Sequence, residues 1–199
     1  MSLWLGQEVQ EVPRRLRLRR LTRPDPPLAD DAVRLEPMSQ ADHAEFLPLV
    51  GDEAIEAFTR IPSDADAPWV ARWIARYERG WDDGSCAGFT ICDAADGATL
   101  GFAALVHLDL DAREGEIGYL VLPAARGRGA AGRSVSLLTR WGFDVLGLER
   151  LELRIDVANV ASERVAERAG YRREGVLRNL HVKEGRRADT GVWSRLSTD

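Results

Sequence analysis

The stretch GEIGYLVLPAARGRGAAGR, residues 115–133, decides the fold of this chain. Its first part, EIGYLVL at 116–122, is a short apolar run that predicts a β-strand. A proline and a loop rich in glycine follow, and the residues from about 129 to 146 carry apolar side chains at helical spacing. The buried face of this predicted helix consists of Val135, Leu138, Trp141 and Val145. The stretch therefore predicts a strand, a loop and a helix in direct succession.

The loop between the predicted strand and helix has the chemistry of a phosphate-binding site. Its glycines let the backbone turn tightly, so that several amide hydrogens point at one spot. The helix N-terminus adds a partial positive charge there, and two arginines add full charges. The predicted cradle consists of Arg126, Gly127, Arg128, Gly129, Ala130, Ala131 and Gly132. Taken alone, these residues are equally compatible with a flexible turn rich in Arg and Gly.

Two other nucleotide-binding loops fit the sequence less well. No Gly-Lys-Ser or Gly-Lys-Thr closes the loop, so it is not a Walker A motif. The Gly-x-Gly-x-x-Gly fingerprint of a dinucleotide-binding fold occurs at Gly127, Gly129 and Gly132. However, it follows several strands and helices, and no acidic residue ends a later strand at the distance that this fold requires.

The rest of the chain predicts one α/β domain with a mixed sheet. Helices are expected from Ser39, which forms a capping box with Asp42, from about Ser63, and from Asn159 up to Gly170. The predicted strands are 33–38, 88–93, 98–109, 116–122, 148–157, 171–181 and 188–196. The resulting order is β-α-α-β-β-β-α-β-α-β-β, which is typical of a single layered domain.

Residues 1–31 are predicted to form an arm ahead of a domain at 32–199. Six arginines lie between Arg14 and Arg23, with Leu16 and Leu18 alternating among them. This pattern fits a short added strand, a solvated extension or a contact in a homodimer. It also fits an arm that binds RNA or the ribosome, although the chain as a whole is acidic.

The composition narrows the class of protein. The chain has 199 residues, of which 45% are hydrophobic and 30% charged, which suffices for a domain with a sizeable core. A formal charge of −5 gives no general attraction to nucleic acid or anionic membranes. No apolar run approaches the roughly 20 residues of a membrane helix, and the N-terminus lacks a signal-peptide pattern, so a cytoplasmic protein is expected. Cys86 and Cys92 are too few for a disulfide framework and are predicted to be small buried residues.

Four motifs in the expected order resemble the GNAT acetyltransferase superfamily over about residues 33–196. The first is the pattern [Gln/Arg]-x-x-Gly-x-[Gly/Ala] at Arg126, Gly129 and Ala131, directly behind Val-Leu-Pro at 121–123. The others are Asn159 with Ser162, Ala-Gly-Tyr at 169–171, and Glu-Gly-x-x-Arg at 174–178. Together they look like the RimJ/RimL branch, which acetylates protein N-termini or other small amines.

The resemblance implies an enzyme that binds acetyl-CoA in a V-shaped opening between the strands at 116–122 and 148–157. Backbone groups near Leu120, Val121 and Leu122 would then bond the pantetheine amides like an added strand. The amides of the glycine loop would hold the pyrophosphate, and Asn159 would bond the pantetheine. An amide near Tyr119 would stabilise the oxyanion that forms from the thioester carbonyl.

The same resemblance implies direct attack by a neutral amine on the thioester. Glu116 is the predicted base, facing the opening with Gly118 and Leu120, and the alternative is a solvated carboxylate at a strand start. Many members of the superfamily use a tyrosine four residues after the position of Ser162, where this chain has Ala166. Ser162 is therefore the predicted proton donor to the thiolate, and the alternative is a hydroxyl that only caps its helix.

The acceptor is predicted to be a primary amine, most simply the α-amine of a protein or peptide. A small amine or an aminoglycoside is the second choice, and a non-catalytic CoA-binding module is the alternative outside enzymes. The acceptor cleft is expected to use residues 59–62, the loop around His181 and the helix that carries Trp69, Trp73 and Tyr77. These aromatic residues recur at every fourth position, which is more often a core face than a cofactor box. No metal is predicted, because no His or Cys has the spacing of a metal site.

Overall fold

The computed structural model describes residues 20–183 and 185–199. Most of the predicted arginine-rich arm, including Leu16 and Leu18, lies outside these residues. The part of residues 1–31 that is described packs against the domain, since Leu21 is buried and its amide donates to the Trp81 carbonyl at 2.8 Å. The boundary at residue 31 and the homodimer stay predictions.

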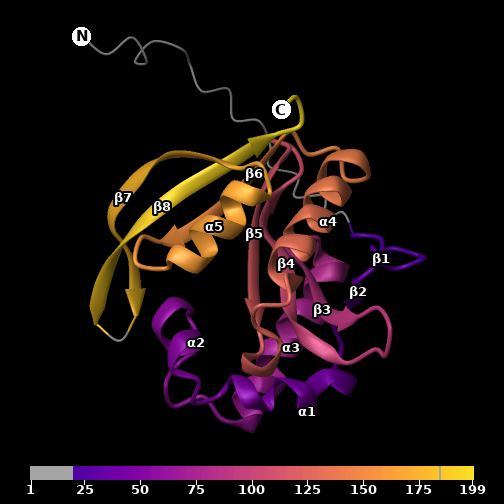
Figure 1. Cartoon of the computed structure of the whole chain (residues 1–199). Coiled ribbons are helices and arrows are strands. Elements are labelled where there is room, and N and C mark those ends of the chain that lie inside the picture. Colours follow the sequence, from indigo (N-terminus) through magenta and orange to yellow (C-terminus); the bar gives the residue numbers. More distant parts are fainter. Residues whose placement is uncertain (1–19, 184) are drawn as a thin grey trace.

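An eight-stranded sheet in the order β1-β2-β3-β4-β5-β6-β8-β7 forms the middle of the molecule (Figure 1). All neighbouring strands are antiparallel except β5 and β6, which are parallel. The strands are β1 (Leu28–Ala29), β2 (Val33–Pro37), β3 (Ala87–Asp93), β4 (Thr99–Asp109), β5 (Glu114–Val121), β6 (Arg150–Asp156), β7 (Arg172–Lys183) and β8 (Arg186–Leu196). The predicted α/β class with a mixed sheet is confirmed.

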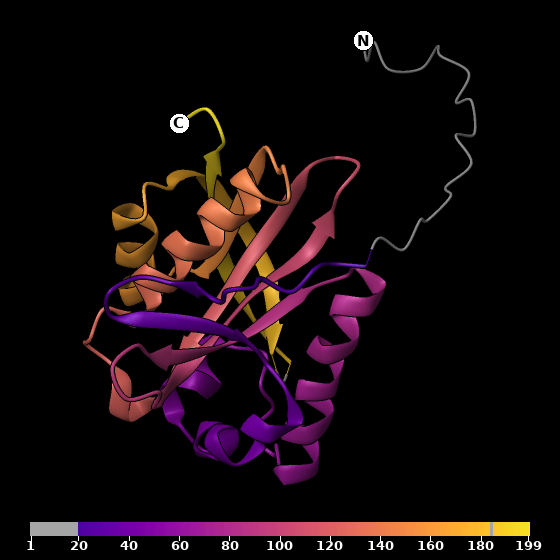
Figure 2. The same ribbon diagram turned by 90° about the vertical axis from the view of Figure 1, so that its right-hand side faces the viewer.

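The helices cover both faces of the sheet, with α3 on one side and α4 and α5 on the other (Figure 2). The α-helices are α1 (His43–Phe46), α2 (Glu53–Phe58), α3 (Ala67–Asp83), α4 (Ala130–Asp144) and α5 (Val160–Arg168). Short 3₁₀ turns occupy Gln40–Asp42, Leu47–Leu49 and Pro123–Ala125. Within the described residues, no helix combines the length and apolar character needed to cross a membrane.

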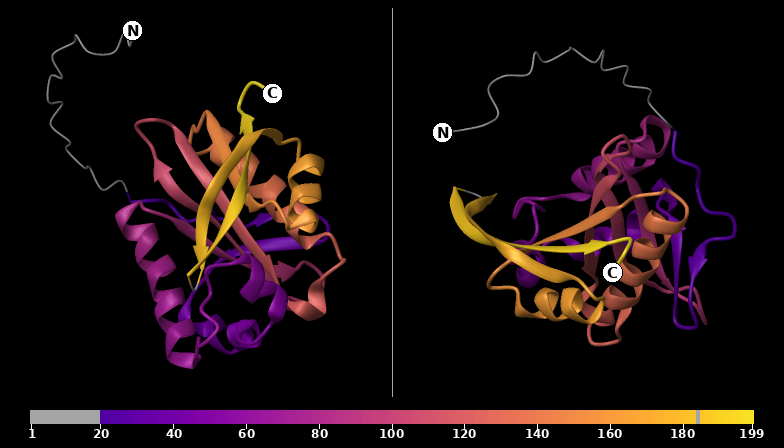
Figure 3. Two further views of the ribbon diagram at one scale, coloured as in Figure 1. Left: turned by 90° about the vertical axis from the view of Figure 1, so that its left-hand side faces the viewer. Right: turned by 90° about the horizontal axis from the view of Figure 1, so that it is seen from above.

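The sheet splits between its two parallel strands. β5 and β6 pair only at Glu114 with Arg150, Gly115 with Leu151 and Glu116 with Glu152, although both strands continue well beyond these pairs. From there the β7–β8 hairpin curves away from the rest of the sheet (Figure 3). The predicted V-shaped opening between these strands is confirmed.

The helices before β3 differ from those predicted. The segment at Ser39 begins with a 3₁₀ turn, in which the Asp42 carboxylate accepts the Ser39 amide at 2.8 Å as the capping pattern predicted. The predicted start at Ser63 is wrong, because α3 begins only at Ala67, where Asp66 caps it by accepting the Trp69 amide at 2.7 Å. The sequence prediction also omitted α2.

The elements after β5 agree more closely with their patterns. Helix α4 buries Val135, Leu138 and Trp141 as predicted, but Val145 is 68% exposed because the helix ends at Asp144 and turns this residue outward. Leu151, Leu153 and Ile155 of β6 are buried as its alternation predicted. Asn159 caps α5 as predicted, and Gly170 follows the end of that helix with a φ of +80°.

Candidate active site

A cavity of about 1060 Å³ lies where β5 and β6 separate. Its walls come from α2, α3, β4, β5, the loop before α4, β6, α5 and the β7–β8 hairpin. Most of the residues predicted from the sequence to act in catalysis or cofactor binding line this one cavity: Glu116, Tyr119, Leu120, Val121, Arg126, Gly127, Gly129, Ala130, Ala131, Gly132, Asn159 and Ser162. Leu122 and Arg128, which were also predicted, do not line it.

The glycine loop presents a row of backbone amides to this cavity. Gly127 and Gly129 both have a φ of +79°, a conformation that residues with a Cβ rarely adopt. Within the described part of the chain, the amides of residues 127–132 donate no hydrogen bond to another protein group, and the first bond of α4 runs from the Arg133 amide to Gly129 at 3.2 Å. Free amides at a helix N-terminus are the donors that phosphate oxygens require. The loop therefore fits the pyrophosphate of a coenzyme A molecule.

The arginines at the two ends of this loop are held by carboxylates. Arg126 forms an ion pair with Asp52 at the start of α2, and this pair holds the pKa of Asp52 below its usual value. Arg133 pairs with Asp30 at 3.0 Å and also with Asp31. Arg126 thus joins the loop to α2, so that its charge lies at the edge of the predicted cradle.

The edge of β5 that faces the opening carries free backbone groups. The sequence predicted a free amide at Leu122. This amide instead donates to the Leu100 carbonyl of β4 at 2.9 Å. Polar backbone groups of successive strand residues point to opposite edges, and the register with β4 is regular here. The backbone groups of Leu120 consequently also face β4, whereas those of Tyr119 and Val121 face the opening.

Glycine at position 118 leaves the middle of the opening empty. A Cβ built on Gly118 would have no heavy atom within 4 Å apart from its neighbours in the chain. Gly118 and its two large neighbours, Ile117 and Tyr119, all line the cavity. A narrow chain such as pantetheine can therefore approach the β5 backbone at this point.

The Glu116 carboxylate lies at the narrow end of the opening. Its side chain is 19% exposed and lies 3.4 Å from Arg154, measured from Oε2 to Nε. Burial raises the pKa of Glu116 above its ordinary value, and Arg154, His107 and Arg60 act in the opposite direction. A partly buried carboxylate with a raised pKa is a suitable proton acceptor near neutral pH.

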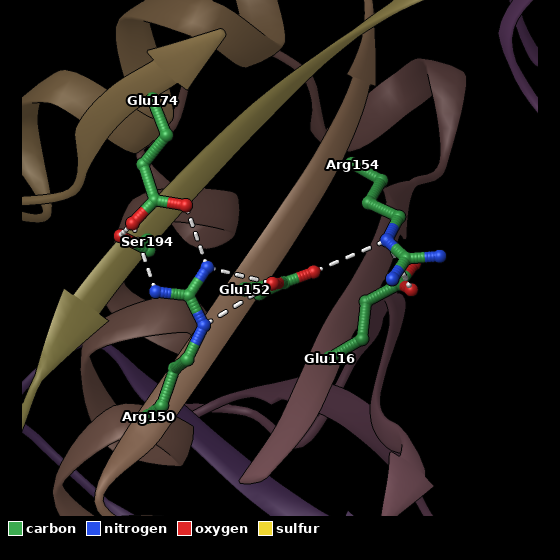
Figure 4. Close-up of polar contacts among 6 residues, drawn as sticks. All are labelled: Glu116, Arg150, Glu152, Arg154, Glu174 and Ser194. Carbon is green, nitrogen blue, oxygen red and sulfur yellow. Dashed lines mark hydrogen bonds and ion pairs between the residues drawn. The ribbon is translucent and has the colours of Figure 1, made fainter. Parts of the chain in front are cut away.

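Arg154 also belongs to a chain of ion pairs that crosses β6 to the hairpin (Figure 4). Its Nε lies 3.2 Å from Oε2 of Glu152, and Glu152 accepts a hydrogen bond from Arg150 at 2.7 Å. Arg150 donates to both oxygens of Glu174, which also accepts from Ser194 and whose pKa falls to about 2. The network fixes Arg154 beside Glu116 at the point where the strands part.

Ser162 and Tyr119 form a pair of hydroxyl groups on the α5 side of the opening. The Asn159 side chain accepts the Ser162 amide at 3.1 Å, which orients the first turn of α5. Burial raises the pKa of Tyr119 to about 12, and Ser162 is close enough to lower it. Among the described residues, the buried Tyr119 hydroxyl has no hydrogen-bond partner of standard geometry. The sequence prediction assigned a role only to the backbone of Tyr119. The alternation of side chains along the strand places Tyr119 on the face opposite Glu116, and this could have suggested a role for its hydroxyl group.

An aromatic wall closes the other side of the cavity. The rings of Trp69 and Trp73 stack with centroids 6.1 Å apart, and Phe102 lies 4.7 Å from both Trp73 and Tyr77. Tyr77 is buried, while Trp69 and Trp73 are partly buried and line the cavity. The predicted aromatic stripe therefore serves the core and the cavity together, beside Thr59, Arg60 and Ile61 from the predicted acceptor cleft.

Comparison with known proteins agrees with this geometry. Residues 32–172 match the acetyltransferase (GNAT) domain family. YoaA of Bacillus subtilis, an uncharacterized N-acetyltransferase, is 36% identical over 96 residues, which are 48% of this chain and about half (52%) of YoaA. YdaF of the same organism, provisionally named a ribosomal N-acetyltransferase, is 31% identical over 104 residues, 52% of this chain and 57% of YdaF.

A solved structure with a similar fold comes from Brucella melitensis. This GCN5-related N-acetyltransferase superimposes with a TM-score of 0.75 at 29% identity, over 90% of this chain and 81% of its own. The split sheet and the loop before α4 thus occur in a fold that other acetyltransferases share.

Proposed function

Because this chain belongs to the GNAT family of acetyltransferases, with acetyl-CoA as the donor, we propose that it acetylates the α-amine of a protein or peptide. The observation that carries the proposal is that the free amides of the glycine loop and the partly buried Glu116 line one cavity. The similarity to YdaF supports a protein acceptor, because that relative is named for the ribosome.

Different residues of the site bind different parts of the acetyl-CoA molecule. The amides of residues 127–132 bind the pyrophosphate, and Arg126 and Arg128 supply positive charge at its edge. The backbone groups of Tyr119 and Val121 form hydrogen bonds with the pantetheine amides. A backbone amide of this strand near Tyr119 also stabilises the oxyanion. The carboxamide oxygen of Asn159 is occupied by the Ser162 amide, so its NH₂ group donates to the pantetheine.

In the reaction, the neutral amine attacks the thioester carbon, so that the N–C bond forms and the C–S bond breaks. Glu116 accepts the amine proton through a water molecule, because its carboxylate lies at the narrow end of the opening. The departing sulfur receives one proton from the Ser162 hydroxyl, and the Tyr119 hydroxyl beside it donates a hydrogen bond to the same sulfur. Ser162 returns to its hydroxyl form by exchange with solvent.

The test is release of free thiol from acetyl-CoA over a panel of amines. The panel contains short peptides with a free N-terminus, their blocked counterparts, polyamines and aminoglycosides. We expect turnover with free peptides and none with blocked ones. Turnover restricted to a polyamine or an aminoglycoside would replace the protein acceptor by a small amine. Tight CoA binding without turnover on any amine would instead indicate a binding module.

Tyr119→Phe is expected to lower kcat about tenfold with little change in the KM for acetyl-CoA, because only the departing sulfur loses a donor. Ser162→Ala is expected to behave alike, and the double variant should be little worse than either, since the hydroxyls act as a unit. Tyr171→Phe is the matched control, because Tyr171 is a buried tyrosine that does not line the cavity, and its hydroxyl lies 2.8 Å from that of Thr139. An equal loss of kcat in Tyr171→Phe would contradict a specific role for Tyr119.

Arg154→Gln is expected to shift the acidic limb of the kcat profile to higher pH. Glu116 must be ionised to accept a proton, its pKa is raised by burial, and Arg154 opposes that rise. Without Arg154 the pKa of Glu116 rises further, so that Glu116 ionises only at a higher pH. Arg154→Lys keeps the charge and should leave the limb near that of the wild type. Two amines of different pKa must show the same shift, because a limb that follows the amine reports the substrate.

A further inference from the structure

The acceptor half of the cavity carries more positive charge than the proposed reaction needs. On this half, Arg60, Arg76 and Arg154 line the wall around the aromatic side chains and Glu116. The other two carboxylates on the cavity wall are Asp30, which pairs with Arg133 beside the glycine loop, and Asp156, at the far end of β6. This local excess contrasts with the chain as a whole, which has 32 acidic residues against 27 lysines and arginines.

Two of these arginines have no ion-pair partner in the described part of the chain. Arg154 is shared between Glu116 and Glu152 and so has its counter-charges. Among the residues that the structure describes, neither Arg60 nor Arg76 is within ion-pairing distance of a carboxylate. Both side chains are exposed on the cavity wall, so a ligand can reach them.

Arg60 lies in the electrostatic neighbourhood of the proposed base, and Arg76 lies beside Tyr77 on the same cavity wall. Arg60 lowers the pKa of Glu116, which places its charge within reach of that carboxyl group. The Arg76 guanidinium lies 5.7 Å from the centre of the Tyr77 ring, and the Tyr77 hydroxyl is influenced by Arg76 and by Glu116. Arg76, Tyr77 and Glu116 thus all line the same cavity, with Arg76 against the Tyr77 ring.

This arrangement suits one kind of acceptor and disfavours another. A polyamine would bring a second cation toward unpaired guanidinium groups, and like charges at close range repel. An amine that also carries a carboxylate or a phosphate would place its cationic end near Glu116 and its anionic end near the arginines. The partly buried faces of Trp69 and Trp73 would cover an apolar portion of the same molecule.

We infer that Arg60 and Arg76 form an anion subsite of the acceptor cavity, and that the acceptor is an amine with an acidic group close to its amino group. This inference rests on the proposed function and names the acceptor class. Since a peptide N-terminus is the proposed acceptor, the acidic group is expected to be an Asp or Glu side chain near that terminus. A small acidic amine offers the same chemistry from another source.

The subsite is tested first by binding, which does not depend on turnover. N-acetylated peptide amides that differ only in Glu, Gln or Lys at the second position are titrated calorimetrically into the CoA-saturated protein. The Glu peptide is expected to bind about tenfold more tightly than the Gln peptide, the size of one charge-assisted hydrogen bond, and the Lys peptide more weakly than both. β-Alanine and its amide, each N-acetylated, form a second arm for the small acidic amine.

Variants assign any preference to the two arginines. Arg60→Gln and Arg76→Gln are expected to remove most of the preference for Glu, and the preference should fall with added salt. Arg72→Gln is the matched control, because Arg72 lies one turn before Arg76 on α3 and does not line the cavity. Steady-state kcat/KM with the free peptides should follow the same order.

The outcomes separate the two proposals. A preference for the acidic ligand that the arginine variants abolish supports the subsite, and the arm that shows it identifies the source as peptide or small molecule. The same binding result without turnover keeps the subsite and overturns the proposed enzymatic function. Equal binding of the Glu, Gln and Lys peptides, with equal binding of the two β-alanine compounds, overturns the subsite even if turnover is rapid.

Discussion

Glu116→Gln is expected to lower kcat by about 100-fold or more, the usual contribution of a positioned general base. Glutamine has nearly the size of glutamate and keeps a polar group beside Arg154, but it cannot accept a proton near neutral pH. The affinity for CoA should remain close to that of the wild type, because the proposed phosphate cradle lies at the other end of the opening. Single-turnover acetylation of a peptide and calorimetric CoA binding measure the two quantities separately.

Glu114→Gln is the matched control for that experiment. Glu114 lies two residues earlier on β5, is exposed and does not line the main cavity. We expect its substitution to change kcat by less than about twofold, in line with exposed charges that contact no reacting group. If Glu116→Gln kept half of the wild-type rate, the amine proton would have to leave by another route, and the proposed role of Glu116 would be wrong.

Ala131→Glu is expected to weaken CoA binding by at least about tenfold, because a carboxylate in the cradle repels the pyrophosphate. The same carboxylate lies in the first turn of α4, where a negative charge favours the helix by about 0.3–1 kcal/mol. The melting temperature of the free protein should therefore stay constant or rise slightly. A loss of binding without a loss of stability distinguishes a destroyed cradle from a damaged fold.

Ala131→Gln isolates the charge in this second experiment. Glutamine adds the same bulk without the charge, so binding should fall much less than in Ala131→Glu. Equal losses in the two variants would show that space, rather than charge, limits binding at the loop. Undiminished CoA binding by Ala131→Glu would place the pyrophosphate elsewhere.

The part of the site that could be predicted from sequence is the part whose conformation is local. The strand, loop and helix at 115–133 follow from apolar runs and glycines, and the positive φ angles of Gly127 and Gly129 agree with that pattern. The Asn159 cap depends on residues three positions apart and was equally accessible. Each of these features is fixed by a few neighbouring residues.

The helix starts before β3 were predicted wrongly because two N-capping aspartates were overlooked in the sequence. No helix was predicted from Asp52, yet Asp52 starts α2 by accepting the Ile55 amide at 2.9 Å. Asp66 does the same for α3, in preference to Ser63. An aspartate three residues before an apolar residue would have predicted both starts.

Contacts between distant elements could not be predicted from local patterns. The pairing of Arg126 with Asp52 joins residues 74 positions apart. The approach of Tyr119 to Ser162 depends on the angle at which α5 returns beside β5. The arginines of the acceptor half look like ordinary exposed residues in the sequence, and only the fold brings Arg60 and Arg76 to the cavity that Glu116 lines.

The three residue pairs that join β5 to β6 also set how the width of the opening varies along its length. Glu116 belongs to the last of these pairs, whereas the glycine loop and Asn159 follow the ends of the two strands, where β5 and β6 are no longer paired. The opening is therefore a wedge, in which the ladder of the sheet holds the Glu116 backbone at the narrow end and the wide end leaves room for a group as bulky as a nucleotide.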